Sequence, residues 1–227
     1  MAKLIKIAIA GEGGQGVQSI GDILAEAGNE EGKEALYIPN FGIEQRGGVS
    51  VAYVQISEEQ IGSPKFKHGD IVIALSERAV ERTRKYVTKD TLFVYDSSLI
   101  AVPEVDDEVV GLQAYDTVAP EAMAQSDSEQ PKSGHVQLPT HARQIVGIPA
   151  TDIAHAELHP RVFNMIILGA TVRAAGAGVV KIETIKKALE SKLGKKFEAN
   201  PKLRELNYNA LQKGIDLVEA ALQEEGK

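Results

Sequence analysis

Residues 9–18 read Ile-Ala-Gly-Glu-Gly-Gly-Gln-Gly-Val-Gln, and they connect an apolar run at residues 4–10 to a helical pattern that starts at Val17. A strand that passes through glycines into a helix presents backbone N–H groups and the positive end of the helix dipole to a phosphate. Glycines allow both the tight turn and the close approach of a ligand to the backbone. The stretch therefore predicts a phosphate-binding loop, with a purely structural glycine turn as the alternative.

The loop lacks one feature of dinucleotide-binding proteins. Its glycines satisfy the Gly-x-Gly-x-x-Gly pattern. Such proteins also place an Asp or Glu at the end of the second strand, where the carboxylate binds a ribose hydroxyl. The second strand is predicted at residues 35–38, and Pro39 and Asn40 follow it without a carboxylate. The loop suits a phosphate group, whereas NAD is disfavoured.

Composition excludes several classes of function. The chain has 227 residues, of which 43% are hydrophobic and 25% charged, as in ordinary globular proteins. The net charge of −7 argues against nucleic-acid binding, which requires a basic surface. Without cysteine, thiolates cannot hold an iron–sulfur cluster. No apolar run reaches the roughly 18 residues of a membrane span, and the N-terminus carries no signal pattern, so we expect a cytoplasmic protein without membrane contact.

Strand and helix patterns alternate through the first hundred residues, which predicts an α/β fold. We expect a mostly parallel, Rossmann-like sheet with helices on both faces and a C-terminal helical extension. The predicted strands are 4–10, 35–38, 49–56, 70–75 and 92–95. The predicted helices are 15–31, 77–87 with Ser76 as its N-cap, 151–159 with Thr151 as its N-cap, 161–176, 181–193, and a last helix that starts at Pro201.

One polar segment interrupts this order. Residues 101–140 contain an acidic cluster and few side chains that a core would bury, which indicates a flexible insertion. We expect residues 1–227 to form a single domain, with its helical C-terminal part at about 151–226.

Two polar residues are candidates for ligand binding. Arg46 follows Gln45 in a glycine-containing loop after the second predicted strand, where α/β sheets bind their ligands. Its guanidinium can make two bonds to a phosphate or carboxylate, and pairing with a nearby acidic side chain is the alternative. Asn164 interrupts the apolar start of helix 161–176. Its amide either caps a neighbouring backbone segment or points into a ligand pocket.

Neither a catalytic residue nor a metal site is predicted. His155 and His159 are four residues apart and would share a helix face, as two zinc ligands can. The sequence His-Ala-Glu-Leu-His does not place its glutamate as in His-Glu-x-x-His, and no third ligand stands out.

Several stretches together resemble one family, the γ subunit or γ domain of 2-oxoacid:ferredoxin oxidoreductases of the pyruvate and 2-oxoglutarate type. The similarity covers most of the chain apart from residues 101–140. The stretches are Gly11-Glu-Gly-Gly-Gln-Gly-Val17, Ile38-Pro-Asn-Phe-Gly-Ile-Glu-Gln-Arg-Gly-Gly48, Ile61-Gly-Ser-Pro64, Asp70-Ile-Val-Ile-Ala-Leu-Ser76 and Pro160-Arg-Val-Phe-Asn-Met-Ile-Ile-Leu-Gly169.

The resemblance implies a subunit of an enzyme that converts a 2-oxoacid and coenzyme A (CoA) into acyl-CoA and CO₂ while reducing ferredoxin. Thiamine diphosphate, Mg²⁺ and [4Fe-4S] clusters would be held by the thiamine-binding and iron–sulfur partner subunits only, and ferredoxin would meet the whole complex. The isolated chain would be inactive. Carried over by position, the residues that contribute to CoA binding would be Gly13, Gly14, Gln15, Gly16, Val17, Gln45, Arg46 and Asn164.

Three alternatives remain at this point. The chain could be the matching subunit of an indolepyruvate or other arylpyruvate or arylglyoxylate oxidoreductase, although Pro39-Asn40-Phe41-Gly42 favours the 2-oxoglutarate or pyruvate type. It could be a stand-alone NAD(P)-binding enzyme, which the missing second-strand acid disfavours. It could also be a non-catalytic assembly module in which the glycine loop only packs.

Overall fold

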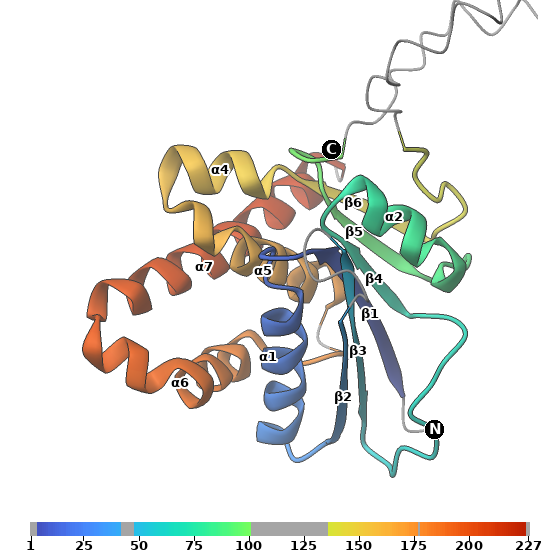
Figure 1. Ribbon diagram of the computed structural model, residues 1–227, viewed down its shortest axis with the longest axis horizontal. Coiled ribbons are helices and arrows are strands. Elements are labelled where there is room, and N and C mark those ends of the chain that lie inside the picture. Colours follow the sequence, from blue (N-terminus) through green and yellow to red (C-terminus); the bar gives the residue numbers. More distant parts are fainter. Residues whose placement is uncertain (1–3, 42–47, 101–135, 177, 226–227) are drawn as a thin grey trace, which may run out of the picture.

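The computed structural model describes residues 4–41, 48–100, 136–176 and 178–225. Its centre is a six-stranded sheet in the order β2-β3-β1-β4-β5-β6 (Figure 1). The strands are β1 (Ile5–Glu12), β2 (Glu34–Asn40), β3 (Val49–Ser57), β4 (Ile71–Ala74), β5 (Leu92–Asp96) and β6 (Gln144–Ile148). Strand β3 runs antiparallel to both of its neighbours, and the other five strands share one direction. This confirms the mostly parallel α/β sheet.

Helices cover both faces of the sheet, as predicted (Figure 1). Helix α2 (Glu77–Thr83) and the 3-10 turn η1 (Arg84–Tyr86) pack on one face. Five helices build the larger core on the other face. They are α1 (Val17–Glu30), α4 (Ala150–Glu157), α5 (Phe163–Ala175), α6 (Ile182–Ala199) and α7 (Pro201–Glu225).

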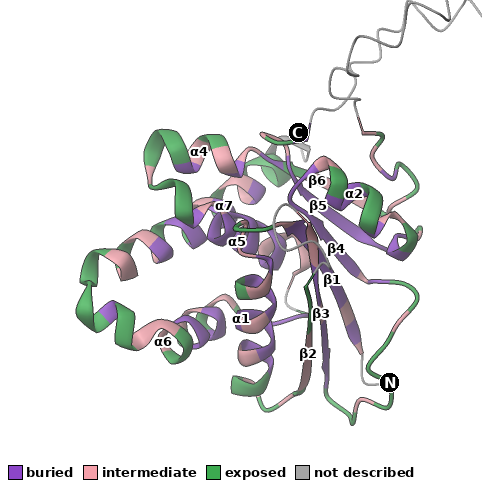
Figure 2. Cartoon of the chain, viewed as in Figure 1, coloured by how far each residue is buried: buried purple, intermediate pink, exposed green. Residues whose placement is uncertain are grey.

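Burial shows that the C-terminal helices belong to the core. Helix α5 is buried on nearly every side because it lies between the sheet and α7, and the residues from Asn164 to Val172 are all buried. Its sequence is apolar nearly all round for this reason. Helices α4 and α6 keep exposed outer faces (Figure 2).

Several boundaries differ from the sequence-based expectation. Strand β6 was missed, and helix α6 continues through Gly194 to Ala199 rather than ending near residue 193. The expected N-cap Thr151 is wrong: α4 begins at Ala150, and the Thr151 hydroxyl donates instead to the Asp96 carboxylate at 2.6 Å. The Ser76 cap is confirmed, because its Oγ accepts from the Ala79 N–H at 3.2 Å.

Most of the predicted insertion, residues 101–135, lies outside the described residues. Its final residues, 136–140, are described, and Val136 and Leu138 pack against the core on the α2 face. Among the described helices, none is long and apolar enough to span a membrane.

Candidate functional site

The glycine loop lies at the carboxyl end of β1 and leads directly into α1. Gly14 and Gly16 have φ angles of +93° and +76°, a backbone conformation that residues other than glycine rarely adopt. Gly13 differs from them, because its φ is not positive and a Cβ there would meet no atom within 4 Å. Gly13 and Gly14 are exposed. Packing within the described chain therefore does not require glycine at position 13.

The Gln15 side chain holds the loop in shape. Its Oε1 accepts from the Glu12 N–H at 2.6 Å, and its Nε2 donates to the Leu75 carbonyl at 3.0 Å. These bonds tie the end of β1 to the end of β4. A Cβ on Gly11 would lie 2.7 Å from Gln15 Oε1, so that glycine makes room for the clamp. The Gln15 amide is thus engaged within the protein.

The start of α1 offers hydrogen-bond donors. The Ile20 N–H makes the first bond of the helix, to the Gly16 carbonyl at 3.1 Å. The N–H groups of Val17, Gln18 and Ser19 precede that bond and have no intrahelical acceptor. They lie at the positive end of the helix dipole, which attracts anions.

Asn164 contacts this loop from α5. The residue is 8% exposed, and its amide packs so tightly against Gly16 that a Cβ on Gly16 would collide with Nδ2. No hydrogen bond to the Asn164 side chain occurs among the described residues, so the amide does not cap a backbone segment there. Among the described residues, the buried side-chain N or O atom without a hydrogen-bond partner is Arg204 Nε, so the Asn164 amide atoms remain open to the adjoining space and can bind a ligand.

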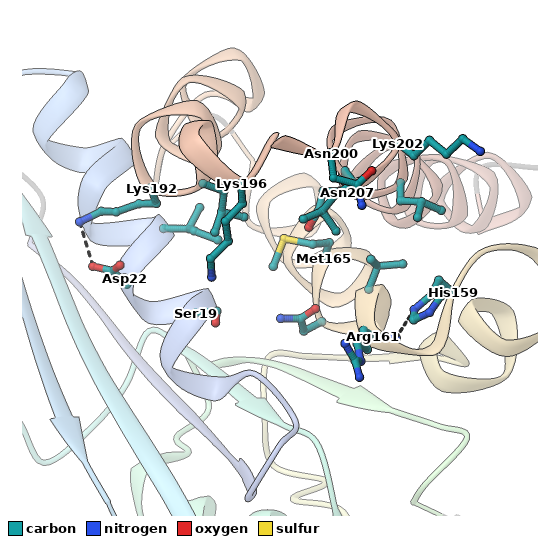
Figure 3. A pocket seen from close by; sticks show the side chains of 16 residues that line it. Ser19, Asp22, His159, Arg161, Met165, Lys192, Lys196, Asn200, Lys202 and Asn207 are labelled. Carbon is teal, nitrogen blue, oxygen red and sulfur yellow. Dashed lines mark hydrogen bonds and ion pairs between the residues drawn. The ribbon is translucent and has the colours of Figure 1, made fainter. Parts of the chain in front are cut away.

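A cavity of about 600 Å³ adjoins this point, and Asn164 is among the residues that line it. Figure 3 shows how α1, the start of α5, the end of α6 and the start of α7 surround it. The apolar lining consists of Ile23, Val162, Met165, Leu193, Leu203 and Leu206. The polar lining consists of Ser19, Asp22, His159, Arg161, Asn164, Lys192, Lys196, Asn200, Lys202 and Asn207.

Lys192 is the one cation of this lining that is paired within the described structure. Its Nζ lies 3.0 Å from Asp22 and 3.2 Å from Glu26. The bond to Asp22, with that to Glu26, raises the pKa of Lys192. Bonds from Ser191 and Lys192 lower the pKa of Glu26. The charge of Lys192 is thus compensated within the protein by two neighbouring carboxylates.

The structure brings only part of the expected site together. The loop at residues 13–17 and Asn164 are adjacent, which the sequence separation of almost 150 residues does not reveal. Gln45 and Arg46 lie outside the described residues. The cationic lining from Arg161, Lys196 and Lys202 was missed, because exposed basic residues on three separate segments give no distinguishing sequence signal.

The two histidines have different environments. The Nδ1 atom of His159 accepts from the Arg161 N–H at 3.1 Å and so helps to start the 3-10 turn η4 (Pro160–Val162). His155 is exposed on α4. Within the described ranges, no group of three or more His, Cys, Asp or Glu side chains could hold a metal ion.

Sheet topology adds a reason against a dinucleotide. In the dinucleotide-binding order the second strand neighbours the first, so its terminal acid lies beside the glycine loop. Here β3 separates β2 from β1 and starts at the loop's edge, with Val49 opposite Glu12. The end of β2 is therefore one strand farther from the loop than the sequence-based argument assumed.

Comparisons with known proteins agree on one family. Residues 6–217 match the family described as pyruvate ferredoxin/flavodoxin oxidoreductase. The ketoisovalerate oxidoreductase subunit VorA of Methanothermobacter thermautotrophicus is 27% identical over 93% of this chain and 36% of its own. The 2-oxoglutarate synthase subunit KorC of Archaeoglobus fulgidus is 28% identical over 82% and 78%, and the pyruvate synthase subunit PorC of Thermotoga maritima is 28% identical over 96% and 97%.

Solved structures show the same relationship. The γ subunit of a keto/oxoacid ferredoxin oxidoreductase from Geobacter sulfurreducens superposes with a TM-score of 0.64 at 25% identity, over 95% of this chain and 99% of that one. The 2-oxoglutarate:ferredoxin oxidoreductase from Magnetococcus marinus, with 2-oxoglutarate, CoA and succinyl-CoA bound, gives 0.70 at 26% identity, over 96% and 31%. This chain spans about a third of that protein and of VorA. It belongs to the pyruvate ferredoxin/flavodoxin oxidoreductase family.

Proposed function

We propose that this chain is the γ subunit of a 2-oxoacid:ferredoxin oxidoreductase. The family match over residues 6–217 supports the proposal, as does the relatives' coverage, which reaches 97% of the PorC subunit. The enzyme would oxidatively decarboxylate a 2-oxoacid, transfer the acyl group to CoA and pass the electrons to ferredoxin. Thiamine diphosphate, Mg²⁺ and [4Fe-4S] clusters belong to the partner subunits in this proposal, and the chain's lack of cysteine fits that division.

Within this enzyme, the chain contributes to CoA binding at the glycine loop. The observation that carries this proposal is Asn164, whose amide makes no hydrogen bond among the described residues, packs on Gly16 and lines a cavity. The free N–H groups of Val17, Gln18 and Ser19 suit the diphosphate of CoA. The Magnetococcus relative was solved with CoA bound, which supports the same ligand here.

The 2-oxoacid itself is proposed only as a class. The named relatives act on ketoisovalerate, 2-oxoglutarate and pyruvate. The sequence Pro39-Asn40-Phe41-Gly42 favours 2-oxoglutarate or pyruvate over an arylpyruvate. No observation on the described residues favours the NAD(P)-binding alternative, and the strand order disfavours it.

The test is CoA dependence in the assembled enzyme. Replacing Arg46 by alanine removes a charge-assisted bond of about 1.5–3 kcal/mol, so the KM for CoA should rise roughly ten- to a hundredfold. Asn164→Ala should raise it less. Arg82→Ala, an exposed arginine on α2 across the sheet, is the matched control. If the first two variants fold and leave the KM for CoA unchanged, this role in CoA binding is wrong.

A further inference from the structure

A second pocket, of about 380 Å³, lies on the α2 face of the sheet, opposite the face that carries the cavity beside Asn164. Its walls come from the end of β2, the middle of β3, the loop before β4 and the turn η1. Helix α2 contacts mainly β1 and β4, so it leaves this end of the sheet without a helical cover. The glycine-loop site does not account for a pocket in this place.

Three aromatic rings form the base of this aromatic pocket. The rings of Tyr53, Phe66 and Tyr86 pack edge to face, with centroids 5.7 to 6.0 Å apart. The hydroxyls of Tyr53 and Tyr86 share one hydrogen bond of 2.8 Å and make no other among the described residues, so one O–H remains free to donate. The base therefore suits a group that combines apolar surface with an oxygen acceptor.

An exposed aromatic side chain follows the pocket directly in the sequence. Ile38, Pro39 and Asn40 line the pocket, and Phe41 comes next. Phe41 is 69% exposed, the highest value of any large hydrophobic side chain among the described residues. A small ligand in the pocket would leave this ring in water, whereas a protein surface would cover both. Exposed aromatic residues grouped in this way are typical of the centre of a protein–protein interface.

The surroundings of the pocket are cationic, although the whole chain carries a net charge of −7. Residues 63–90 contain seven Lys or Arg against four Asp or Glu. Lys65 lines the pocket, and Lys85 Nζ lies 5.1 Å from the centre of the Tyr86 ring. Both lysines are exposed, and neither is in an ion pair within the described part of the chain. Unpaired cations at the edge of an apolar surface favour a partner with carboxylates.

We propose that the aromatic pocket, with Phe41, Lys65 and Lys85, docks an acidic segment of a partner subunit of the same enzyme. The inference rests on the proposed function, which supplies the partner subunits. An apolar side chain of that segment fills the pocket, and its carboxylates lie on the two lysines. The segment does not extend the sheet at β2, because Pro39 has no N–H to offer a further strand. The contact is therefore made through side chains.

The first experiment treats the complex that copurifies with the chain with a carbodiimide, which joins lysine amines to carboxylates in contact with them. Mass spectrometry of the peptides should find Lys65 or Lys85 joined to an Asp or Glu of a thiamine-binding or iron–sulfur subunit. Links from these lysines only to a second copy of the chain, or only to acidic residues of the same chain, would assign the surface to another occupant and overturn the inference.

The second experiment measures by calorimetry the affinity of the full chain for a complex depleted of it, at low and at high salt. Phe41→Ala and Lys65→Glu should each weaken this binding about tenfold. Wild-type binding should weaken as salt increases, and Lys65→Glu should remove most of that dependence. Because Phe41 and Lys65 are exposed, both variants should fold, which circular dichroism confirms.

Lys187→Glu is the matched control, because Lys187 is an exposed lysine of α6, on the other face of the sheet. It should bind as wild type does. If wild type joins the complex and the Phe41 and Lys65 variants bind equally well, or if Lys187→Glu weakens binding as much as Lys65→Glu, the inference is overturned and the proposed function stands. If no thiamine-binding or iron–sulfur subunit copurifies with the chain, the proposed function fails and this inference fails with it.

Discussion

At the scale of single residues, the fold requires glycine at some positions of the glycine loop but not at position 13. Gly16 adopts a positive φ and packs under Asn164. Gly13 has neither constraint. A glycine without an intramolecular reason, in a loop that suits phosphate, fits a site that a ligand approaches closely.

Gly16→Ala should therefore reduce stability, whereas Gly13→Ala should reduce CoA binding. Gly16→Ala should lower the free energy of unfolding by about 1–3 kcal/mol, because the left-handed backbone and the Asn164 contact both disfavour a Cβ. Gly13→Ala should change that free energy by no more than about 0.5 kcal/mol but weaken CoA binding about tenfold. Urea unfolding and calorimetry measure the two quantities.

Gly62→Ala is the control for that pair, because a Cβ at Gly62 also meets nothing within 4 Å and the position is far from the loop in sequence. It should affect neither stability nor affinity. Unchanged CoA affinity in a folded Gly13→Ala protein would contradict the role of this glycine.

Tyr53 gives a second prediction for a single residue. Burial, with the 2.8 Å bond between its hydroxyl and that of Tyr86, raises the pKa of Tyr53 from 10.0 to about 12. Between these values the folded chain retains a proton that the unfolded chain has lost, so stability falls as pH rises. The contribution is complete below pH 10 and is lost as pH approaches 12.

In Tyr53→Phe this component is absent, so the free energy of unfolding should decline less steeply between pH 10 and 12. Part of the decline should persist, because burial and a bond to Glu190 raise the pKa of Tyr208 to about 12 as well. Unfolding measured at several pH values provides the test. Equal slopes for the variant and wild type would rule out this contribution from Tyr53.

At the scale of elements, α5 and α7 pack with their backbones in close contact. A Cβ on Gly169 would collide with the Leu211 carbonyl, and one on Gly214 would collide with the Ile166 carbonyl. Each helix thus presents a glycine to the backbone of the other. This contact anchors α7 to the helix that carries Asn164.

Gly169→Ala and Gly214→Ala should each destabilise the protein by about 1–3 kcal/mol or more, since an added methyl must push two packed backbones apart. Gly194→Ala in α6 is the contrasting variant, because a Cβ there meets nothing within 4 Å. It should be neutral or should stabilise by about 0.5–1 kcal/mol through helix propensity. Thermal unfolding of the three variants tests the prediction, and similar effects at all three positions would refute the packing argument.

Secondary-structure elements were predicted correctly where the local sequence pattern is strong. Predictions were wrong or missing where residues distant in the sequence determine the structure. Buried strands such as β4 and β5, and the Ser76 cap, follow from short apolar runs and a local hydrogen bond. Strand β6 was missed because it is short, half-exposed and stabilised by pairing with β5, which is almost 50 residues away. Thr151 was misread because the acceptor of its hydroxyl, Asp96, lies at the end of β5, more than 50 residues earlier in the chain.

For the candidate site, too, the sequence predicted the contiguous part and missed the part that packing brings together. The glycine loop is readable because strand, turn and helix are contiguous. Its neighbour Asn164 was identified from an odd polar residue in an apolar helix, but the sequence could not decide between a cap and a ligand contact. Lys196 and Arg161 come from separate helices, and only the packing of α6 against α1 places Lys196 on the cavity.

At the scale of the whole molecule, the chain carries binding features without a set of reacting groups. It has no cysteine, and the described residues contain no cluster that could hold a metal ion. In VorA and in the Magnetococcus enzyme, the matching region is about a third of a longer chain. Both observations fit a protein that acts as one part of a larger enzyme.

The isolated chain should therefore form no acyl-CoA from a 2-oxoacid, CoA and an electron acceptor, while material purified from its source should sediment as a hetero-oligomer with that activity. The physical reason is that electrons released by decarboxylation need a redox group, and this chain has no thiolate to hold one. Activity assays on both preparations, with sedimentation velocity at native expression, test the prediction. Adding the purified chain to a complex depleted of it should restore turnover and CoA dependence together. Acyl-CoA formation by the pure chain, or a lone monomer in native material, would show that it works without partners.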